Sequence, residues 1–102
     1  MEVKFGNKEL ERLFHTGKSQ KIRLPTEVIK KLPMRYRAIE AAVTIYDFWQ
    51  SPALNFEKLE GNNLFSMRIN NQWRMELSIE FIDLERTFGK VCIEKISNHY
   101  KK

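Results

Sequence analysis

The stretch SMRINNQWRMEL (residues 66–77) decides the fold, because its hydrophobic pattern sets how two strands pair. Apolar and polar residues alternate on both sides of the polar residues 70–72, which is typical of half-buried strands joined by a hairpin turn. Directly opposed residues of paired strands point to the same face. A three-residue loop pairs Met67 with Met75 and keeps the apolar residues on one face, whereas a two-residue loop mixes the faces. Asparagine is expected there because it tolerates the left-handed conformation that such a loop needs.

The same register places Arg68 opposite Arg74 on the other face of the hairpin. Like charges in directly opposed positions are unfavourable, by a few tenths to ~1 kcal/mol. Glu76 and Glu80 share this face, and they are the simplest source of compensating charge. Alternatively, the two guanidinium groups bind a phosphate, to which each offers a bidentate pair of donors. The hairpin alone leaves both interpretations open.

The first half of the chain has a helical pattern. Asn7 is suited to cap a short helix over residues 8–16. Between residues 25 and 50, apolar residues recur at spacings of three and four, and Pro33 interrupts the run. We therefore expect two helices or one kinked helix there. The apolar face of this run consists of Ile29, Leu32, Tyr36, Ile39, Val43 and Tyr46.

The second half of the chain has the period of two that is typical of strands. Strands are predicted over residues 65–69, 73–81 and 90–96, and a further short strand over residues 3–5. Trp73 falls on the apolar face of the hairpin, so we expect it in the core. No internal repeat or low-complexity segment interrupts the chain, and its length predicts a single domain over residues 1–102.

The composition is that of a basic, folded domain. Of the 102 residues, 42% are hydrophobic and 12% aromatic, which is enough for one core. The formal net charge of +5 suggests an acidic partner, such as a nucleic acid, an acidic protein segment or a membrane surface. The positive charges of the second helical run, Lys30, Lys31, Arg35 and Arg37, lie off its apolar face and are expected to be solvated.

Cys92 is the sole cysteine, so an intramolecular disulfide is impossible and a buried thiol in a reducing compartment is expected. The N-terminal residues lack the apolar core of a signal peptide, and no stretch approaches the ~20 apolar residues of a membrane span. A soluble, cytoplasmic protein is therefore expected. Two distant histidines and one cysteine do not have the spacing of a metal site, and no motif for a cofactor is present.

The segment LEGNNLFSMRINNQWRMEL (residues 59–77) resembles a signature of HigB-like toxins in the RelE/ParE superfamily. The resemblance extends to LERLF near the N-terminus, to the long central helical run and to ISNHY at the C-terminus. It implies an α+β fold with N-terminal helices packed on one face of a small antiparallel β-sheet. It also implies a toxin of a type II toxin–antitoxin pair that cleaves mRNA on the ribosome. The implied partner is a HigA-like helix-turn-helix antitoxin.

The resemblance also implies a set of site residues. Arg68 and Arg74 match the family's two hairpin arginines, which line the RNA site. Many relatives end in Asp-Tyr-His, whereas this chain has Asn98-His99-Tyr100, with the last two exchanged. Neighbours on a strand point to opposite faces, so either Tyr100 takes the place of the histidine or the tail is shifted. The expected RNA contacts are Lys58, Lys95, Asn98, Asn70 and Gln72. Glu60 stands where the family has a lysine.

The implied chemistry is acid–base cleavage of RNA without a metal or other cofactor. A base removes the proton of the ribose 2′-hydroxyl, which attacks the adjacent phosphorus, and an acid protonates the leaving 5′-oxygen. Arg68 and Arg74 would stabilise the charge on the phosphoryl oxygens. Histidine is the side chain that titrates near neutral pH when unperturbed, so His99 is the best candidate acid or base, while Tyr100 could donate a proton or stack on a base.

Two other functions remain open from the sequence. The first is a ParE-like toxin that acts on DNA gyrase without the catalytic residues. The second is a non-toxic, basic module that binds RNA or protein. The arginines and the His/Tyr pair favour the endonuclease over both alternatives.

Overall fold

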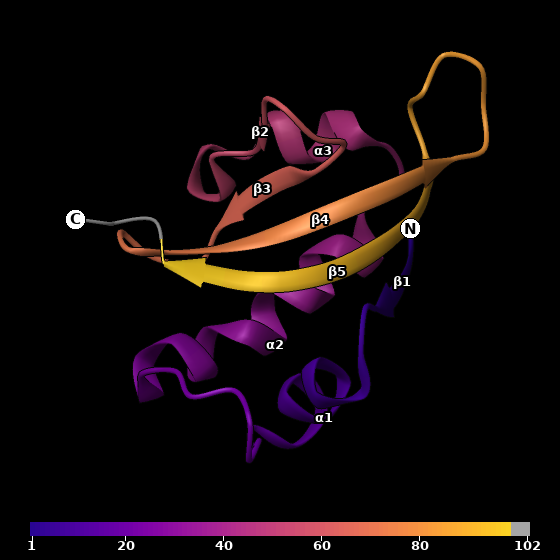
Figure 1. The fold of residues 1–102 in the computed structure, drawn as a ribbon. Coiled ribbons are helices and arrows are strands. Elements are labelled where there is room, and N and C mark those ends of the chain that lie inside the picture. The colour runs from indigo at the N-terminus through magenta and orange to yellow at the C-terminus, as the bar shows by residue number, and fades with distance from the viewer. Residues whose placement is uncertain (99–102) are drawn as a thin grey trace.

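Five strands form one sheet in the computed structural model, which describes residues 1–98. The sheet order is β1-β5-β4-β3-β2 (Figure 1). The strands are β1 (Glu2–Phe5), β2 (Glu57–Lys58), β3 (Phe65–Arg68), β4 (Trp73–Phe81) and β5 (Gly89–Asn98). The helices are α1 (Lys8–Thr16), α2 (Thr26–Ala41), α3 (Ile45–Trp49) and the short 3-10 helix η1 (Pro52–Leu54). None of these helices is long and apolar enough to cross a membrane.

The β3–β4 hairpin has the register that its hydrophobic pattern predicts. Met67 lies opposite Met75, and the N–H of Ile69 donates to the carbonyl oxygen of Trp73 (2.9 Å), which leaves residues 70–72 as the turn. The loop differs from expectation in one respect, because none of its residues adopts a positive φ. Instead, the side-chain oxygen of Asn70 accepts hydrogen bonds from the backbone N–H groups of Gln72 (2.9 Å) and Trp73 (2.8 Å). Asn70 therefore shapes the turn through its side chain rather than through a left-handed backbone.

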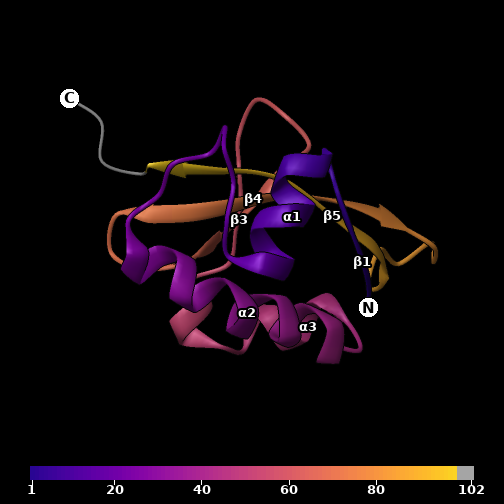
Figure 2. The ribbon, with the colours of Figure 1, turned by 90° about the horizontal axis from the view of Figure 1, so that it is seen from below.

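The helices cover one face of the sheet, as Figure 2 shows. The alternate residues of β4, such as Glu76 and Ser78, point to the other face. Helix α1 begins at Asn7, whose side chain accepts from the N–H of Leu10 (2.9 Å), and ends at Gly17 with φ of 75°. The α+β fold with helices on one face is confirmed. Fully buried members of the core include Leu10, Leu13, Val28, Leu32, Ile39, Met67, Met75, Leu77, Val91 and Ile93.

The helical run between residues 25 and 50 forms two helices, but the break is not at Pro33. Pro33 lies inside α2, and the chain leaves the helix only after Ala41. Thr44 and Asp47 then form a capping box that starts α3. Because the break shifts the helical phase, two residues predicted on the apolar face are exposed, namely Val43 (75%) and Tyr46 (55%).

The sheet is mixed rather than wholly antiparallel. Strand β1 runs parallel to β5, and Val3 lies opposite Val91. Strand β2, within the connector before the hairpin, pairs with β3 and forms the far edge. The periodicity of a strand reports which residues share a face but not which strand lies beside it. Neither pairing was therefore predicted.

Gly89 is required where β5 begins. A Cβ atom at this position would lie 2.0 Å from the carbonyl oxygen of Glu80 and 2.8 Å from the Cα of Phe81. Backbone atoms cannot move aside as a flexible side chain would. We expect Gly89→Ala to lower the free energy of unfolding by about 1–3 kcal/mol or more in urea denaturation. Lys90→Ala, at the adjacent exposed position, is the matched control, and equal stability of the two variants would contradict this account.

Candidate functional site

Two arginines, one buried and one half-buried, face each other at the turn end of the hairpin. Arg68 is the last residue of β3, and its cross-strand partner is Arg74 in β4, as the sequence predicts. Only 7% of the surface of Arg74 is exposed. Within residues 1–98, the buried Nε of Arg68 and the buried Nε and Nη1 of Arg74 have no hydrogen-bond partner. Buried N–H donors are normally paired, so this unpaired set is unusual and points to an acceptor that the described chain does not supply.

The acidic residues of the same face do not compensate the arginine pair. Glu76 forms an ion pair with Lys95, with 3.8 Å between Oε1 and Nζ. Glu80 lies further along β4, opposite Lys90 of β5. Among the described residues, neither Arg68 nor Arg74 forms an ion pair with a carboxylate. The simpler interpretation was that local acidic residues compensate the charge of the arginine pair. The structure does not support it.

Arg35 of α2 holds the end of the strand that carries Arg68. Its Nε donates to the carbonyl oxygen of Arg68 (2.7 Å), and its Nη2 donates to that of Ile69 (3.2 Å). Burial lowers the pKa of Arg35 from its ordinary value. The expectation that this residue belongs to a solvated helix face was wrong. Helical periodicity identifies the apolar face of a helix. It does not show that a charged side chain beside that face donates hydrogen bonds to the carbonyl oxygens of a strand.

The arrangement offers fixed positive charge to one anion. Two guanidinium groups meet on one face, at least three of their N–H donors are unpaired, and a third arginine fixes the backbone beneath them. A phosphate group matches this chemistry, because its oxygens accept two parallel N–H bonds from each guanidinium. Among residues 1–98, no group of three or more His, Cys, Asp or Glu side chains is placed to hold a metal ion.

Comparison with known proteins identifies the family. A family model described as the RelE-like toxin of the type II toxin–antitoxin system HigB matches residues 3–86, which include the whole hairpin. The chain belongs to this HigB-like toxin family. The fold agrees, because the YoeB–YefM complex from Staphylococcus aureus contains a similar structure, with a TM-score of 0.56. The two sequences are 18% identical over 98% of each chain. No curated protein matches the sequence.

Among the residues expected at the site of this HigB-like toxin, Lys95 lies on the arginine face. Its side chain is 63% exposed, and it lies two residues along β5 from Ser97, the cross-strand partner of Arg74. Asn98 lies opposite Trp73 and therefore on the other face from Arg74. His99 and Tyr100 lie outside the described residues.

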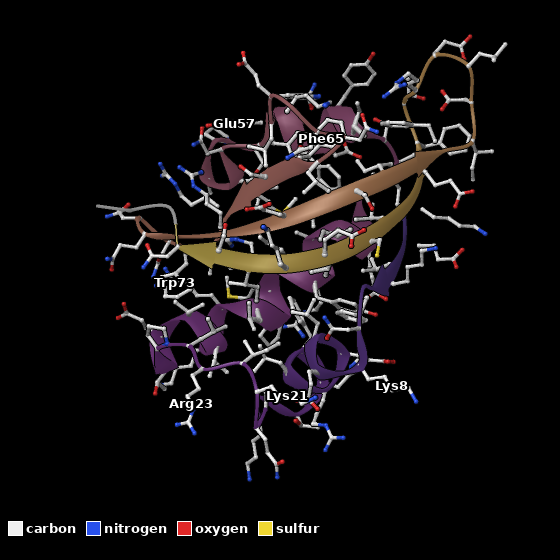
Figure 3. The ribbon with its side chains drawn as sticks, in the orientation of Figure 1. Lys8, Lys21, Arg23, Glu57, Phe65 and Trp73 are labelled. Carbon is white, nitrogen blue, oxygen red and sulfur yellow. The ribbon has the colours of Figure 1, made fainter. Side chains whose placement is uncertain are left out.

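Lys58 and the hairpin turn are placed away from the arginine pair. Lys58 lies opposite Phe65, whose ring belongs to the core, and its Nζ donates to the carbonyl oxygen of Asn62 (2.8 Å). Gln72 belongs to the turn, beside a cavity of about 300 Å³ that Glu27 and Lys31 also line. Trp73 is half-buried against the core, as expected, and lies on the helix side of the sheet (Figure 3). The structure thus brings Arg68, Arg74 and Lys95 to one face and leaves Lys58 elsewhere.

Cys92 of the HigB-like chain lies on the polar face, opposite Ser78. Burial and the nearby Glu94 carboxylate raise the pKa of the thiol. Because the thiolate is the reactive form, we expect Cys92 to react with iodoacetamide at pH 7 more slowly than a cysteine in a short peptide. The reaction should accelerate as pH rises through the elevated pKa. A rate equal to that of the peptide at pH 7 would contradict this prediction.

Proposed function

We propose that this HigB-like toxin is a ribosome-dependent mRNA endonuclease that acts by acid–base chemistry without a metal. One observation carries the proposal. Arg68 and Arg74 are held in direct opposition with buried, unpaired N–H donors, and no described carboxylate neutralises them. Such a pair opposes folding unless an anion completes it. The phosphate of a single-stranded message supplies that anion.

The proposed reaction breaks one phosphodiester bond. A base takes the proton of the 2′-hydroxyl, the resulting oxygen attacks phosphorus, and the bond from phosphorus to the 5′-oxygen breaks. An acid returns a proton to the leaving oxygen, so the products are a 2′,3′-cyclic phosphate and a 5′-hydroxyl. Arg68 and Arg74 donate to the non-bridging oxygens, where charge builds. His99 and Tyr100 remain the proposed proton carriers, and the exposed Lys95 is the proposed contact to a flanking phosphate.

A cognate antitoxin is the proposed partner of this toxin, and the cytoplasm is its proposed location. The family is that of type II toxin–antitoxin systems, and the structural neighbour is a complex of YoeB with YefM. A HigA-like helix-turn-helix protein is the specific partner that we propose. Such a protein would be encoded beside the toxin.

Global mapping of RNA 5′ ends after brief induction tests the proposed function. The wild-type chain is expected to arrest growth and to produce new ends inside translated frames, whereas Arg74→Met should produce neither. Purified toxin should cut a message on translating ribosomes but not the same message as free RNA, because the proposal requires the ribosome. Growth arrest without new ends would contradict the proposal and point to a target such as gyrase. Soluble, folded protein that neither arrests growth nor cuts RNA would also contradict it.

A further inference from the structure

Exposed apolar side chains gather at the opposite end of the sheet from the arginine pair. Of the seven large apolar residues that are exposed in the described chain, six belong to residues 43–49 or to the β4–β5 loop (residues 82–88), namely Val43, Tyr46, Trp49, Ile82, Leu84 and Phe88. The two segments are joined, because the N–H of Ile45 donates to the carbonyl oxygen of Thr87 (2.7 Å). Figure 1 shows the loop extending beyond the ends of β4 and β5. Such a concentration of exposed apolar side chains marks an interaction surface.

Internal contacts fix the shape of the β4–β5 loop. The carboxylate of Asp83 accepts from both the backbone N–H (2.9 Å) and the hydroxyl of Thr87. Arg86 adopts φ of 59°, a left-handed conformation that residues with a Cβ atom rarely adopt. Its guanidinium lies over the ring of Phe81, 4.9 Å from the ring centroid. The loop therefore presents Leu84, which is 97% exposed, without requiring a ligand to order it.

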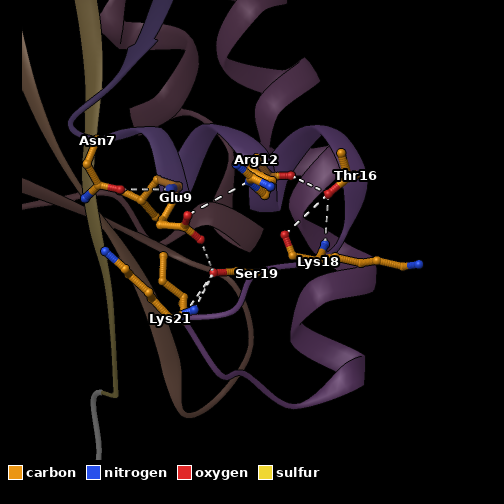
Figure 4. Close-up of polar contacts among 9 residues, drawn as sticks. Asn7, Glu9, Arg12, Thr16, Lys18, Ser19 and Lys21 are labelled. Carbon is orange, nitrogen blue, oxygen red and sulfur yellow. Dashed lines mark hydrogen bonds and ion pairs between the residues drawn. The ribbon is translucent and has the colours of Figure 1, made fainter.

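A second long loop, over residues 17–25, shows what is unusual about the β4–β5 loop. Ser19 donates to Glu9 of α1 (2.8 Å), and this bond ties the loop to the helix (Figure 4). Ile22 of the same loop packs against the core. The β4–β5 loop is also held by hydrogen bonds, but it turns Leu84 to solvent. Its apolar side chains therefore contribute a surface rather than core packing.

A hollow of about 440 Å³ lies beside Leu84. Three apolar residues of the sheet line it, namely Phe65, Ile79 and Phe81, and Leu84 itself lines it from the loop. A contact across a twofold axis uses the same patch of both copies, so a projecting side chain and the hollow that receives it must both lie near the axis. An axis beside Leu84 meets this condition, because each Leu84 would then lie over the hollow of the other copy.

The two residues after Leu84 carry opposite charges. Glu85 and Arg86 are both exposed, and within residues 1–98 neither forms an ion pair. Beside a twofold axis, Glu85 of each copy can meet Arg86 of the other, so the charges match in both directions. RNA, or a segment with charges of one sign, would leave one of the two residues unmatched. The charge pattern therefore favours a second copy of this chain as the partner.

We propose that the chain forms a twofold-symmetric dimer through the β4–β5 loop and the start of α3, with Leu84 of each copy seated in the hollow of the other. Burial of the exposed apolar side chains supplies the affinity. Two reciprocal ion pairs between Glu85 and Arg86 fix the relative orientation of the copies. The patch is small, so the dimer is expected to be weak and reversible.

The proposed contact leaves the arginine pair open. Arg74 and Phe81 are seven residues apart on β4, which at ~3.3 Å per residue separates them by about 23 Å. Both arginine pairs of the dimer would therefore lie away from the contact, and each copy could bind RNA. This consequence rests on the proposed function, whereas association of the two copies does not.

Sedimentation equilibrium of the whole chain tests the proposal. The mass is expected to rise from that of one chain towards that of two as the concentration rises from about 10 µM to about 1 mM. Leu84→Asp should raise the Kd of the dimer about tenfold or more, because each copy loses an apolar contact and places a charge in the hollow. Met34→Asp is the matched control, since Met34 is 57% exposed on α2 and lies outside both segments. It should leave the Kd unchanged.

Exchange of the two charges tests the twofold arrangement. Glu85→Lys and Arg86→Glu should each raise the Kd about fivefold or more, because each variant brings like charges together across the axis. An equimolar mixture of the two variants should associate about as tightly as the wild type, since every pair across the axis then joins opposite charges. General attraction between apolar surfaces would not produce this rescue.

Three outcomes would overturn the proposal. They are a wild-type chain that remains monomeric at about 1 mM, equal effects of Met34→Asp and Leu84→Asp, and a mixture of the charge variants that associates no better than either variant alone. A chain that is monomeric by itself but binds an antitoxin or RNA through Leu84 would also overturn it and would assign the patch to that partner. None of these readouts depends on RNA cleavage.

Discussion

Arg74→Met is expected to abolish RNA cleavage while leaving the fold at least as stable. Loss of one donor to the charge that develops in a transition state typically lowers the rate about 10²–10³-fold. The same substitution removes the repulsion between the opposed positive charges of Arg68 and Arg74. It also removes two buried nitrogen atoms of Arg74 that have no hydrogen-bond partner. The free energy of unfolding should therefore rise by a few tenths to about 1 kcal/mol. Methionine keeps most of the length of the side chain, so the packing around it is largely preserved.

Cleavage by the purified variant on translating ribosomes and its urea denaturation curve measure the two effects. Arg37→Met is the matched control, because Arg37 is exposed on α2. Arg37→Met should change neither the cleavage rate nor the free energy of unfolding appreciably. A fall in the free energy of unfolding of Arg74→Met that is large enough to explain its loss of cleavage would contradict this account. It would mean that Arg74 supports the fold rather than the chemistry.

Arg35→Met is expected to lower both stability and activity. The side chain donates to the carbonyl oxygens of Arg68 and Ile69, and hydrogen bonds from a charged donor contribute more than neutral ones. We expect the free energy of unfolding to fall by about 1.5–3 kcal/mol. Activity should fall as well, because the strand end that carries Arg68 is no longer held against α2.

Arg35→Lys tests the geometry of this contact. A lysine keeps the charge but lacks the rigid planar donors that reach two carbonyl oxygens at once, so it should restore only part of the lost stability. Urea denaturation and the cleavage assay on ribosomes provide the measurements. Wild-type stability in Arg35→Met would show that the contact has no energetic role. Full rescue by lysine would show that charge alone is sufficient.

The hairpin was predictable because its two strands are joined by a short loop. Alternation of apolar residues permits only the register in which Met67 lies opposite Met75, and that register brings Arg68 to Arg74. Because each strand of the hairpin pairs with the next segment along the chain, the hydrophobic pattern alone determines which residues lie opposite each other. This is why the central pair of the candidate site followed from the sequence.

The features that escaped prediction depend on contacts between distant segments. The bond from Arg35 to Arg68 joins residues 33 positions apart, and β1 pairs with a strand at the other end of the chain. One missed feature did have a local signal, since Thr44 and Asp47 have the spacing of a capping box. Lys58 was near the hairpin in sequence, but its register with Phe65 turns it to the opposite face.

The most direct test of the central claim observes the arginine side chains themselves. The Nε–H signals of Arg68 and Arg74 can be followed by NMR while a short single-stranded RNA is added. Because 2′-O-methyl groups remove the nucleophile, such an RNA binds without being cut. We predict that both Nε–H signals shift and exchange more slowly with water, while that of Arg37 does not change. Unchanged signals from Arg68 and Arg74 under RNA concentrations that perturb other parts of the protein would contradict the account.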